Sequence, residues 1–135
     1  MKTRDIALVT GTLACMLAIP VLAQGSKDWV DIKSPDELRA LYSNKTFTGE
    51  AFAPRGRIPF VGYYRADGSG VLVVNDQRIP RTWAVKGDEV CITDFRATNC
   101  LRYQRNKAQP NQIIGRQGQQ HWAVRFTVKD GVPKF

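Results

Sequence analysis

Residues 58–75 read IPFVGYYRADGSGVLVVN. Aromatic and aliphatic residues dominate 58–65 and 70–75, and the segment between them contains the dipeptide Asp67-Gly68. Asp-Gly pairs adopt the left-handed backbone conformations that join two adjacent antiparallel strands. The stretch therefore predicts a β-hairpin with strands at 58–65 and 70–75.

The same alternation of short strands and turns continues on both sides of this hairpin. Further strands are predicted at 46–52, 78–86, 89–95, 99–106, 112–116 and 120–129. Glycine, proline, aspartate and asparagine residues mark the turns between them. Eight short strands at intervals of roughly 8–12 residues are typical of an antiparallel meander that closes into a barrel or curls strongly. The predicted fold class is therefore mainly β.

The last predicted strand shows which of its faces is apolar. Trp122, Val124, Phe126 and Val128 alternate with more polar residues along 120–129. A period of two residues is the pattern of a strand that is buried on one face. We expect the aromatic face of this strand to lie in the core.

One short helix is predicted before the strands. Residues 34–37 read SPDE, which places a capping serine, a proline and a glutamate at the positions that start a helix. Leu38, Leu41 and Tyr42 then follow at spacings of three and four, which puts them on one face. The helix should end near residue 43, and 24–33 is expected to be a short lead-in.

Residues 1–23 have the features of an export signal. A basic head precedes an apolar run from 6 to 22, and Val21 and Ala23 are the small residues that signal peptidase requires. Cleavage after Ala23 would leave residues 24–135 as a single β-barrel-like domain in the periplasm or outside the cell. Two alternatives are a membrane anchor, for which the run is slightly short, and a lipoprotein signal at Ala14-Cys15.

The remaining cysteines predict a disulfide. Cleavage removes Cys15, and eight residues with a central turn separate Cys91 from Cys100. Two adjacent antiparallel strands can place such a pair opposite one another, and an oxidising compartment favours the bond. The alternatives are two free thiols, a zinc site or a redox pair. The zinc site lacks enough ligands, and the redox pair lacks the two-residue spacing.

The chain is basic, with a formal net charge of +8 at pH 7. Without residues 1–23 the net charge is about +7, and the arginines are scattered instead of forming one block. Such a surface attracts anionic partners, which outside the cytoplasm would be lipid, lipopolysaccharide, acidic glycan or an acidic exported protein. The compartment argues against nucleic acid. A solvated basic surface without a dedicated partner is the alternative.

Aromatic and arginine side chains on neighbouring predicted strands are the candidate binding residues. Arginine combined with aromatic faces can bind sugars, lipid headgroups or acidic peptides. The alternative places the aromatic residues in the core and the arginines in solvent. The candidates are Tyr63, Arg65, Arg81, Trp83, Arg102, Tyr103 and Arg105.

Catalytic motifs are not found in the sequence. It contains no Gly-x-Ser-x-Gly motif, and its single histidine, His121, has no nearby histidine or glutamate partner in the sequence. Asp67, Asp76 and Asp88 lie at predicted turns, where aspartate is common for conformational reasons. We therefore expect no catalytic residues, no metal and no cofactor.

Four segments resemble a known group of proteins. They are SPDEL at 34–38, KTFTG at 45–49, YYRADGSG at 63–70 and TWAVKGDEVC at 82–91, together with Cys100. This pattern resembles small exported lipocalin-like proteins of uncharacterised families of Gram-negative bacteria. The resemblance implies a lipocalin-like antiparallel barrel, and it implies no activity.

These observations favour an exported, non-catalytic binding module of the bacterial envelope. Its basic surface is expected to contact an anionic component. Two alternatives remain open: a barrel that carries a small apolar ligand, and an inhibitor of an exported enzyme.

Overall fold

The computed structural model describes residues 28–119 and 123–135. The predicted signal peptide at 1–23, including Cys15, lies outside the described residues, and so do His121 and Trp122. No helix among the described residues combines the length and the apolar character that crossing a membrane requires.

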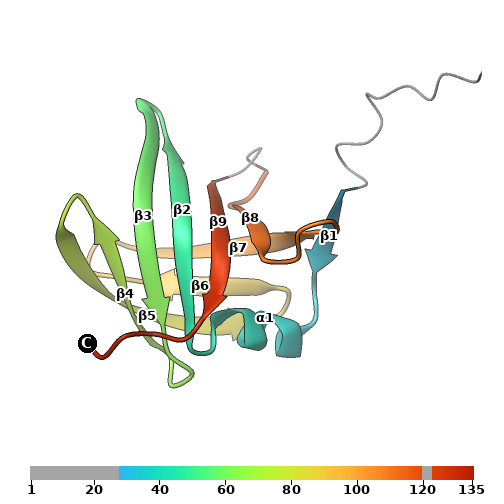
Figure 1. Cartoon of the computed structure of the whole chain (residues 1–135), viewed down its shortest axis with the longest axis horizontal. Coiled ribbons are helices and arrows are strands. Elements are labelled where there is room, and N and C mark those ends of the chain that lie inside the picture. The colour runs from blue at the N-terminus through green and yellow to red at the C-terminus, as the bar shows by residue number, and fades with distance from the viewer. Residues whose placement is uncertain (1–27, 120–122) are drawn as a thin grey trace, which may run out of the picture.

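Eight antiparallel strands, β2 to β9, form a closed barrel (Figure 1). Each strand pairs with the next along the chain, and β9 pairs with β2, so the sheet has no open edge between them. The predicted meander and the mainly β fold class are confirmed. The strands are β2 (Lys45–Ala53), β3 (Gly56–Tyr64), β4 (Ser69–Val74), β5 (Gln77–Lys86), β6 (Glu89–Thr93), β7 (Thr98–Asn106), β8 (Gln112–Arg116) and β9 (Val124–Asp130).

A ninth strand lies outside this circuit. Strand β1 (Trp29–Ile32) pairs with the second half of β7, where Ile32 lies opposite Tyr103. The prediction that 24–33 is only a lead-in was therefore wrong for these four residues. Only Ile32 of β1 is buried, so the segment is too short and too exposed to show an alternating pattern.

Alternation along the strands decides which side chains fill the barrel. On β9, Val124 and Val128 pack against the core and Phe126 belongs to it, as the sequence predicted for this face. On β5, Ile79, Arg81 and Trp83 share the more buried face. An arginine therefore occupies an interior position that an apolar residue would normally fill.

Helix α1 (Pro35–Tyr42) covers one end of the barrel (Figure 1). The Ser34 side chain caps it by accepting a hydrogen bond from the Glu37 backbone N–H at 3.5 Å, as predicted. Leu38, Leu41 and Tyr42 are buried, which confirms the predicted apolar face.

The connections of an up-and-down barrel alternate between its ends, so the β3–β4 and β5–β6 turns lie at the end that helix α1 covers.

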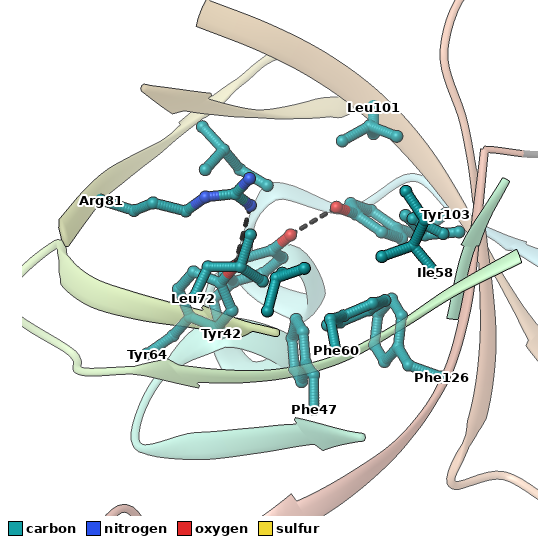
Figure 2. A pocket seen from close by; sticks show the side chains of 14 residues that line it. Tyr42, Phe47, Ile58, Phe60, Tyr64, Leu72, Arg81, Leu101, Tyr103 and Phe126 are labelled. Atoms are coloured by element: carbon teal, nitrogen blue, oxygen red, sulfur yellow. Dashed lines mark hydrogen bonds between the residues drawn. The ribbon is translucent and has the colours of Figure 1, made fainter. Parts of the chain in front are cut away.

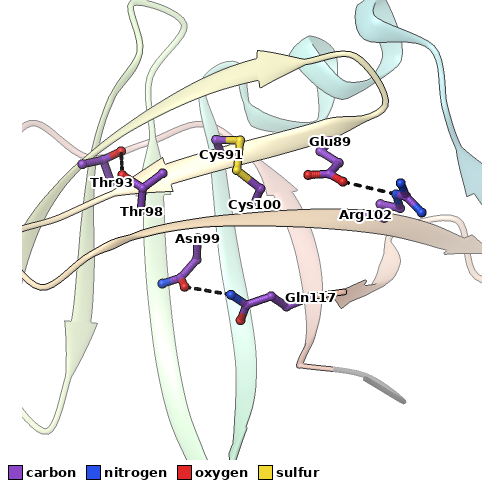
Figure 3. The surroundings of a disulfide bond; sticks show 8 residues. All are labelled: Glu89, Cys91, Thr93, Thr98, Asn99, Cys100, Arg102 and Gln117. Carbon is purple, nitrogen blue, oxygen red and sulfur yellow. Dashed lines mark hydrogen bonds and ion pairs between the residues drawn. A yellow bond between two sulfur atoms is a disulfide. The ribbon is translucent and has the colours of Figure 1, made fainter. Parts of the chain in front are cut away.

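The predicted disulfide joins Cys91 of β6 to Cys100 of β7 (Figure 3). The two residues are direct partners in the strand register, and Thr93 and Thr98 share a 2.9 Å hydrogen bond two positions further on. Val90 and Ile92 belong to the core, so the disulfide lies on the outer face of the sheet. Glu89 lies nearby, but the two bonded sulfurs are not thiolate ligands for a metal.

Removing the disulfide is expected to destabilise the barrel. The double variant Cys91→Ala, Cys100→Ala should lose roughly 2–3 kcal/mol of unfolding free energy, because the bond restricts a short loop of the unfolded chain. Urea unfolding measures this difference. Adding reductant should lower the stability of the wild-type protein by the same amount and leave the double variant unchanged. Equal stability of the wild-type protein and the double variant without reductant would contradict the expectation.

Candidate functional site

The barrel encloses a cavity of about 100 Å³ that is partly open to solvent (Figure 2). Helix α1 and seven of the eight barrel strands, all except β8, contribute side chains to its wall. Most of the wall is aliphatic or aromatic. Its main apolar residues are Phe47, Phe60, Leu72, Ile92, Leu101 and Phe126.

The polar part of the wall consists of four residues, Tyr42, Tyr64, Arg81 and Tyr103, here called the Arg–Tyr cluster. The hydroxyl groups of Tyr42 and Tyr103 are hydrogen-bonded to each other. Arg81 donates from Nη1 to the Tyr64 hydroxyl at 3.4 Å. The cluster joins the helix to three strands that are distant in sequence, so it exists only in the folded barrel.

Glycines opposite the tyrosines make room for their rings. A Cβ atom at Gly70 would lie 2.6 Å from the Tyr64 ring, and one at Gly115 would lie 2.7 Å from the Tyr103 ring. Both glycines are direct strand partners of these tyrosines. The sequence therefore provides a glycine at the places where an interior tyrosine lies flat against the neighbouring strand.

The three phenol groups of the cluster are buried, and their pKa values are raised further above neutral pH. Tyr42, Tyr64 and Tyr103 are each at most 2% exposed, and burial raises the pKa of each above its ordinary value. The neighbouring Tyr103 raises the pKa of Tyr42 further. At neutral pH all three hydroxyl groups therefore carry a proton that can be donated in a hydrogen bond.

Asp94 links the Arg–Tyr cluster to a second arginine. Its carboxylate is 4% exposed, and Arg96 donates to it from Nη2 at 2.8 Å and from Nε at 3.3 Å. Arg81 approaches the same carboxylate with Nε at 3.3 Å, an ion pair that lacks hydrogen-bond geometry. Two guanidinium groups thus share one carboxylate, which leaves one positive charge in excess at this part of the wall.

The pH dependence of stability should report on Asp94. Hydrogen bonds from Arg96 hold the pKa of the Asp94 carboxyl well below its ordinary value. A carboxyl with a lowered folded-state pKa stabilises the fold above its ordinary pKa, and this contribution is lost as the pH falls towards the folded-state value. Asp94→Asn should therefore be less stable at neutral pH and lose less stability between about pH 5 and about pH 2.

Urea unfolding at several pH values tests this prediction. Asp76→Asn is the matched control, because Asp76 is an exposed turn residue that forms no ion pair with the other described residues. Its stability should follow the same pH profile as the wild-type protein. Identical pH profiles for Asp94→Asn and the wild-type protein would contradict the assigned role of this carboxylate.

The structure separates the seven sequence-predicted binding residues into groups. Arg81 and Tyr103 line the cavity, and Trp83 packs beside them against Tyr42 with ring centroids 5.2 Å apart. The other four lie away from the cavity wall. Their contacts are the pairing of Tyr63 and Arg65 with Phe135, the ion pairs of Arg102 with Asp88 and Glu89, and the hydrogen bond from Arg105 to the Pro110 carbonyl.

Three residues of this site were not predicted as binding residues. The sequence predicts Tyr42 only as part of the apolar face of the helix, and it places Tyr64 on the strand at 58–65 and Asp94 on the strand at 89–95. The available signal was the residue type, since tyrosine at an interior position brings a hydroxyl group that needs a partner. Alternation along the strand also puts Arg81 on the same face as Ile79 and Trp83, which indicates a polar group inside the barrel.

Comparisons with known proteins add no functional information. The resemblance to small exported lipocalin-like proteins therefore stays a prediction. No family model matches the chain, and no curated protein or solved structure matches it.

Proposed function

We propose that the protein binds one small, mainly apolar ligand inside its barrel and performs no catalysis on it. The observation that carries this proposal is the cavity of about 100 Å³ with its mostly aliphatic and aromatic wall. Eight-stranded barrels are just wide enough to hold one small ligand. An apolar cavity of about 150 Å³ binds benzene, so this smaller cavity of about 100 Å³ encloses no more than about one ring or a short alkyl chain of the ligand.

The topology suggests how a ligand enters. Helix α1 covers the end of the barrel where β2 begins. The β2–β3, β4–β5 and β6–β7 turns lie at the opposite end, here called the open end. Ile58 follows the β2–β3 turn, lines the cavity and is 36% exposed, so it forms part of the rim.

Export is part of the same proposal. The predicted signal peptide would place the protein in the periplasm or outside the cell, and a disulfide between Cys91 and Cys100 is compatible with an oxidising compartment. Contact between the basic surface and an anionic envelope component remains a separate prediction. That contact is not needed for the cavity to hold a ligand.

Methyl NMR with 1-hexanol and benzene tests whether the cavity binds apolar molecules. We expect saturable shifts of the Leu72, Ile92 and Leu101 methyl signals, because these side chains line the cavity. The Val30 methyl signals serve as the control, since Val30 is 46% exposed on β1. Shifts restricted to exposed methyl groups, or no shifts with either compound, would reject the proposal.

A further inference from the structure

The polar part of the cavity wall contains more hydrogen-bond donors than acceptors. A guanidinium group has five N–H donors. Among the described contacts, Arg81 uses one of them in a hydrogen bond, the 3.4 Å contact with Tyr64, and its buried Nε has no hydrogen-bond partner. Asp94 lies 3.3 Å from the Arg81 Nε as an ion pair without hydrogen-bond geometry, and both of its oxygens also accept from Arg96.

The tyrosines add further donors to the same region. Three phenol groups bring three protons, and the contact between Tyr42 and Tyr103 uses one of them. Tyr64 accepts from Arg81, so its own proton remains free to be donated among the described contacts. Tyr42 and Tyr103 have two hydroxyl protons and share one hydrogen bond, so one of these protons also remains available to a ligand among the described contacts. The cluster thus presents N–H and O–H groups to a ligand.

We propose that the ligand is a monocarboxylic acid whose carboxylate is bound by Arg81 and the tyrosine hydroxyls of the Arg–Tyr cluster. This inference rests on the proposed function, because it names the class of ligand that the same cavity holds. An ionised carboxylate accepts hydrogen bonds only, and arginine binds it with two parallel N–H donors. The apolar body of the acid then lies along Phe47, Leu72 and Phe126, towards the open end.

Charge favours a carboxylate over a neutral group or a phosphate. Arg81, Arg96 and Asp94 together carry one excess positive charge. A carboxylate neutralises that charge, whereas an alcohol leaves it uncompensated. A phosphate monoester carries close to two negative charges at neutral pH and would leave an excess negative charge in a mostly apolar cavity.

Calorimetry with hexanoate, 1-hexanol and hexyl phosphate tests the inference. At 0.15 M salt we expect hexanoate to bind at least about tenfold more tightly than the other two. Arg81→Met should weaken hexanoate binding by roughly tenfold to a hundredfold and change 1-hexanol binding by less than about threefold. Arg78→Met is the matched control, because Arg78 is exposed on the same strand and its loss removes the same charge.

The outcomes separate this inference from the proposed function. If 1-hexanol binds as tightly as hexanoate or more tightly, the proposal that the ligand is a carboxylic acid is overturned, and the proposal that the cavity binds an apolar ligand stands. If hexyl phosphate binds more tightly than hexanoate, the carboxylic acid proposal is also overturned. It is overturned as well if Arg81→Met and Arg78→Met weaken hexanoate binding equally. If no compound binds, the proposed function itself fails.

A second variant decides the question if Arg81→Met does not fold. Tyr64→Phe keeps the buried ring and removes one hydroxyl donor from the cluster. It should weaken hexanoate binding by about threefold to tenfold and weaken 1-hexanol binding by a smaller factor. Unchanged hexanoate binding by a folded Tyr64→Phe protein would overturn the role of this hydroxyl and, with it, the assigned carboxylate position.

Discussion

Replacing Gly49 with alanine is expected to lower the free energy of unfolding by about 3 kcal/mol or more, because the added methyl group has no space. A Cβ atom at Gly49 would lie 1.9 Å from the Arg125 carbonyl oxygen and 2.5 Å from the Phe126 Cα atom. Both contacts are to the backbone of β9, which cannot move aside as a flexible side chain can. The substitution therefore separates β2 from β9, the pair that closes the barrel.

Urea unfolding of Gly49→Ala and of the neighbouring variant Thr48→Ala measures this effect. Thr48 is exposed on the same strand, so its replacement should cost no more than about 1 kcal/mol. The difference between the two variants isolates the clash at Gly49 from the general preference of a strand for β-branched residues. Equal stability of the two variants would show that the β2–β9 contact is looser than described.

Replacing Ala51 with phenylalanine is expected to abolish binding of small apolar ligands. Ala51 lines the cavity and lies opposite Ile58 on β3 and Val124 on β9. A phenyl ring at this position would occupy most of a space of about 100 Å³. Filling an interior cavity commonly raises stability by about 0.5–2 kcal/mol, so the loss of binding should not be accompanied by unfolding.

Calorimetry with 1-hexanol and thermal unfolding together test the Ala51 prediction. Ala84→Phe is the matched control, because Ala84 is exposed on the outer face of β5 and the same side chain is introduced there. This control should bind 1-hexanol as the wild-type protein does. An Ala51→Phe protein that is folded and still binds 1-hexanol with wild-type affinity would place the ligand outside this cavity.

Most of the barrel could be predicted from the sequence because its elements follow local rules. The Asp67-Gly68 turn and the alternation along β9 are short-range signals, and strand boundaries around them follow from turn chemistry. Strand β1 could not be predicted in this way. The segment is a strand because it pairs with residues of β7 that are more than 70 positions away in the sequence.

The candidate site was predictable only in part, because the fold assembles it from distant segments. Alternation places Arg81 and Trp83 on one face of β5, and the sequence identifies both as candidates. Nothing local shows that Tyr42, on a helix, reaches the hydroxyl of Tyr103 on β7. The pairing of Arg81 with Asp94 likewise depends on the register between β5 and β6.

Intermolecular NMR contacts that locate a bound hexanoate test most directly whether its carboxylate lies at the Arg–Tyr cluster. We expect contacts from the α-methylene group of hexanoate to the rings of Tyr64 and Tyr103, and from its terminal methyl group to Ile58 at the rim. Contacts with Val61 and Val73, which pair on the outer face of β3 and β4, would contradict this placement. The reversed orientation, with the terminal methyl group beside the tyrosines, would contradict the carboxylate assignment.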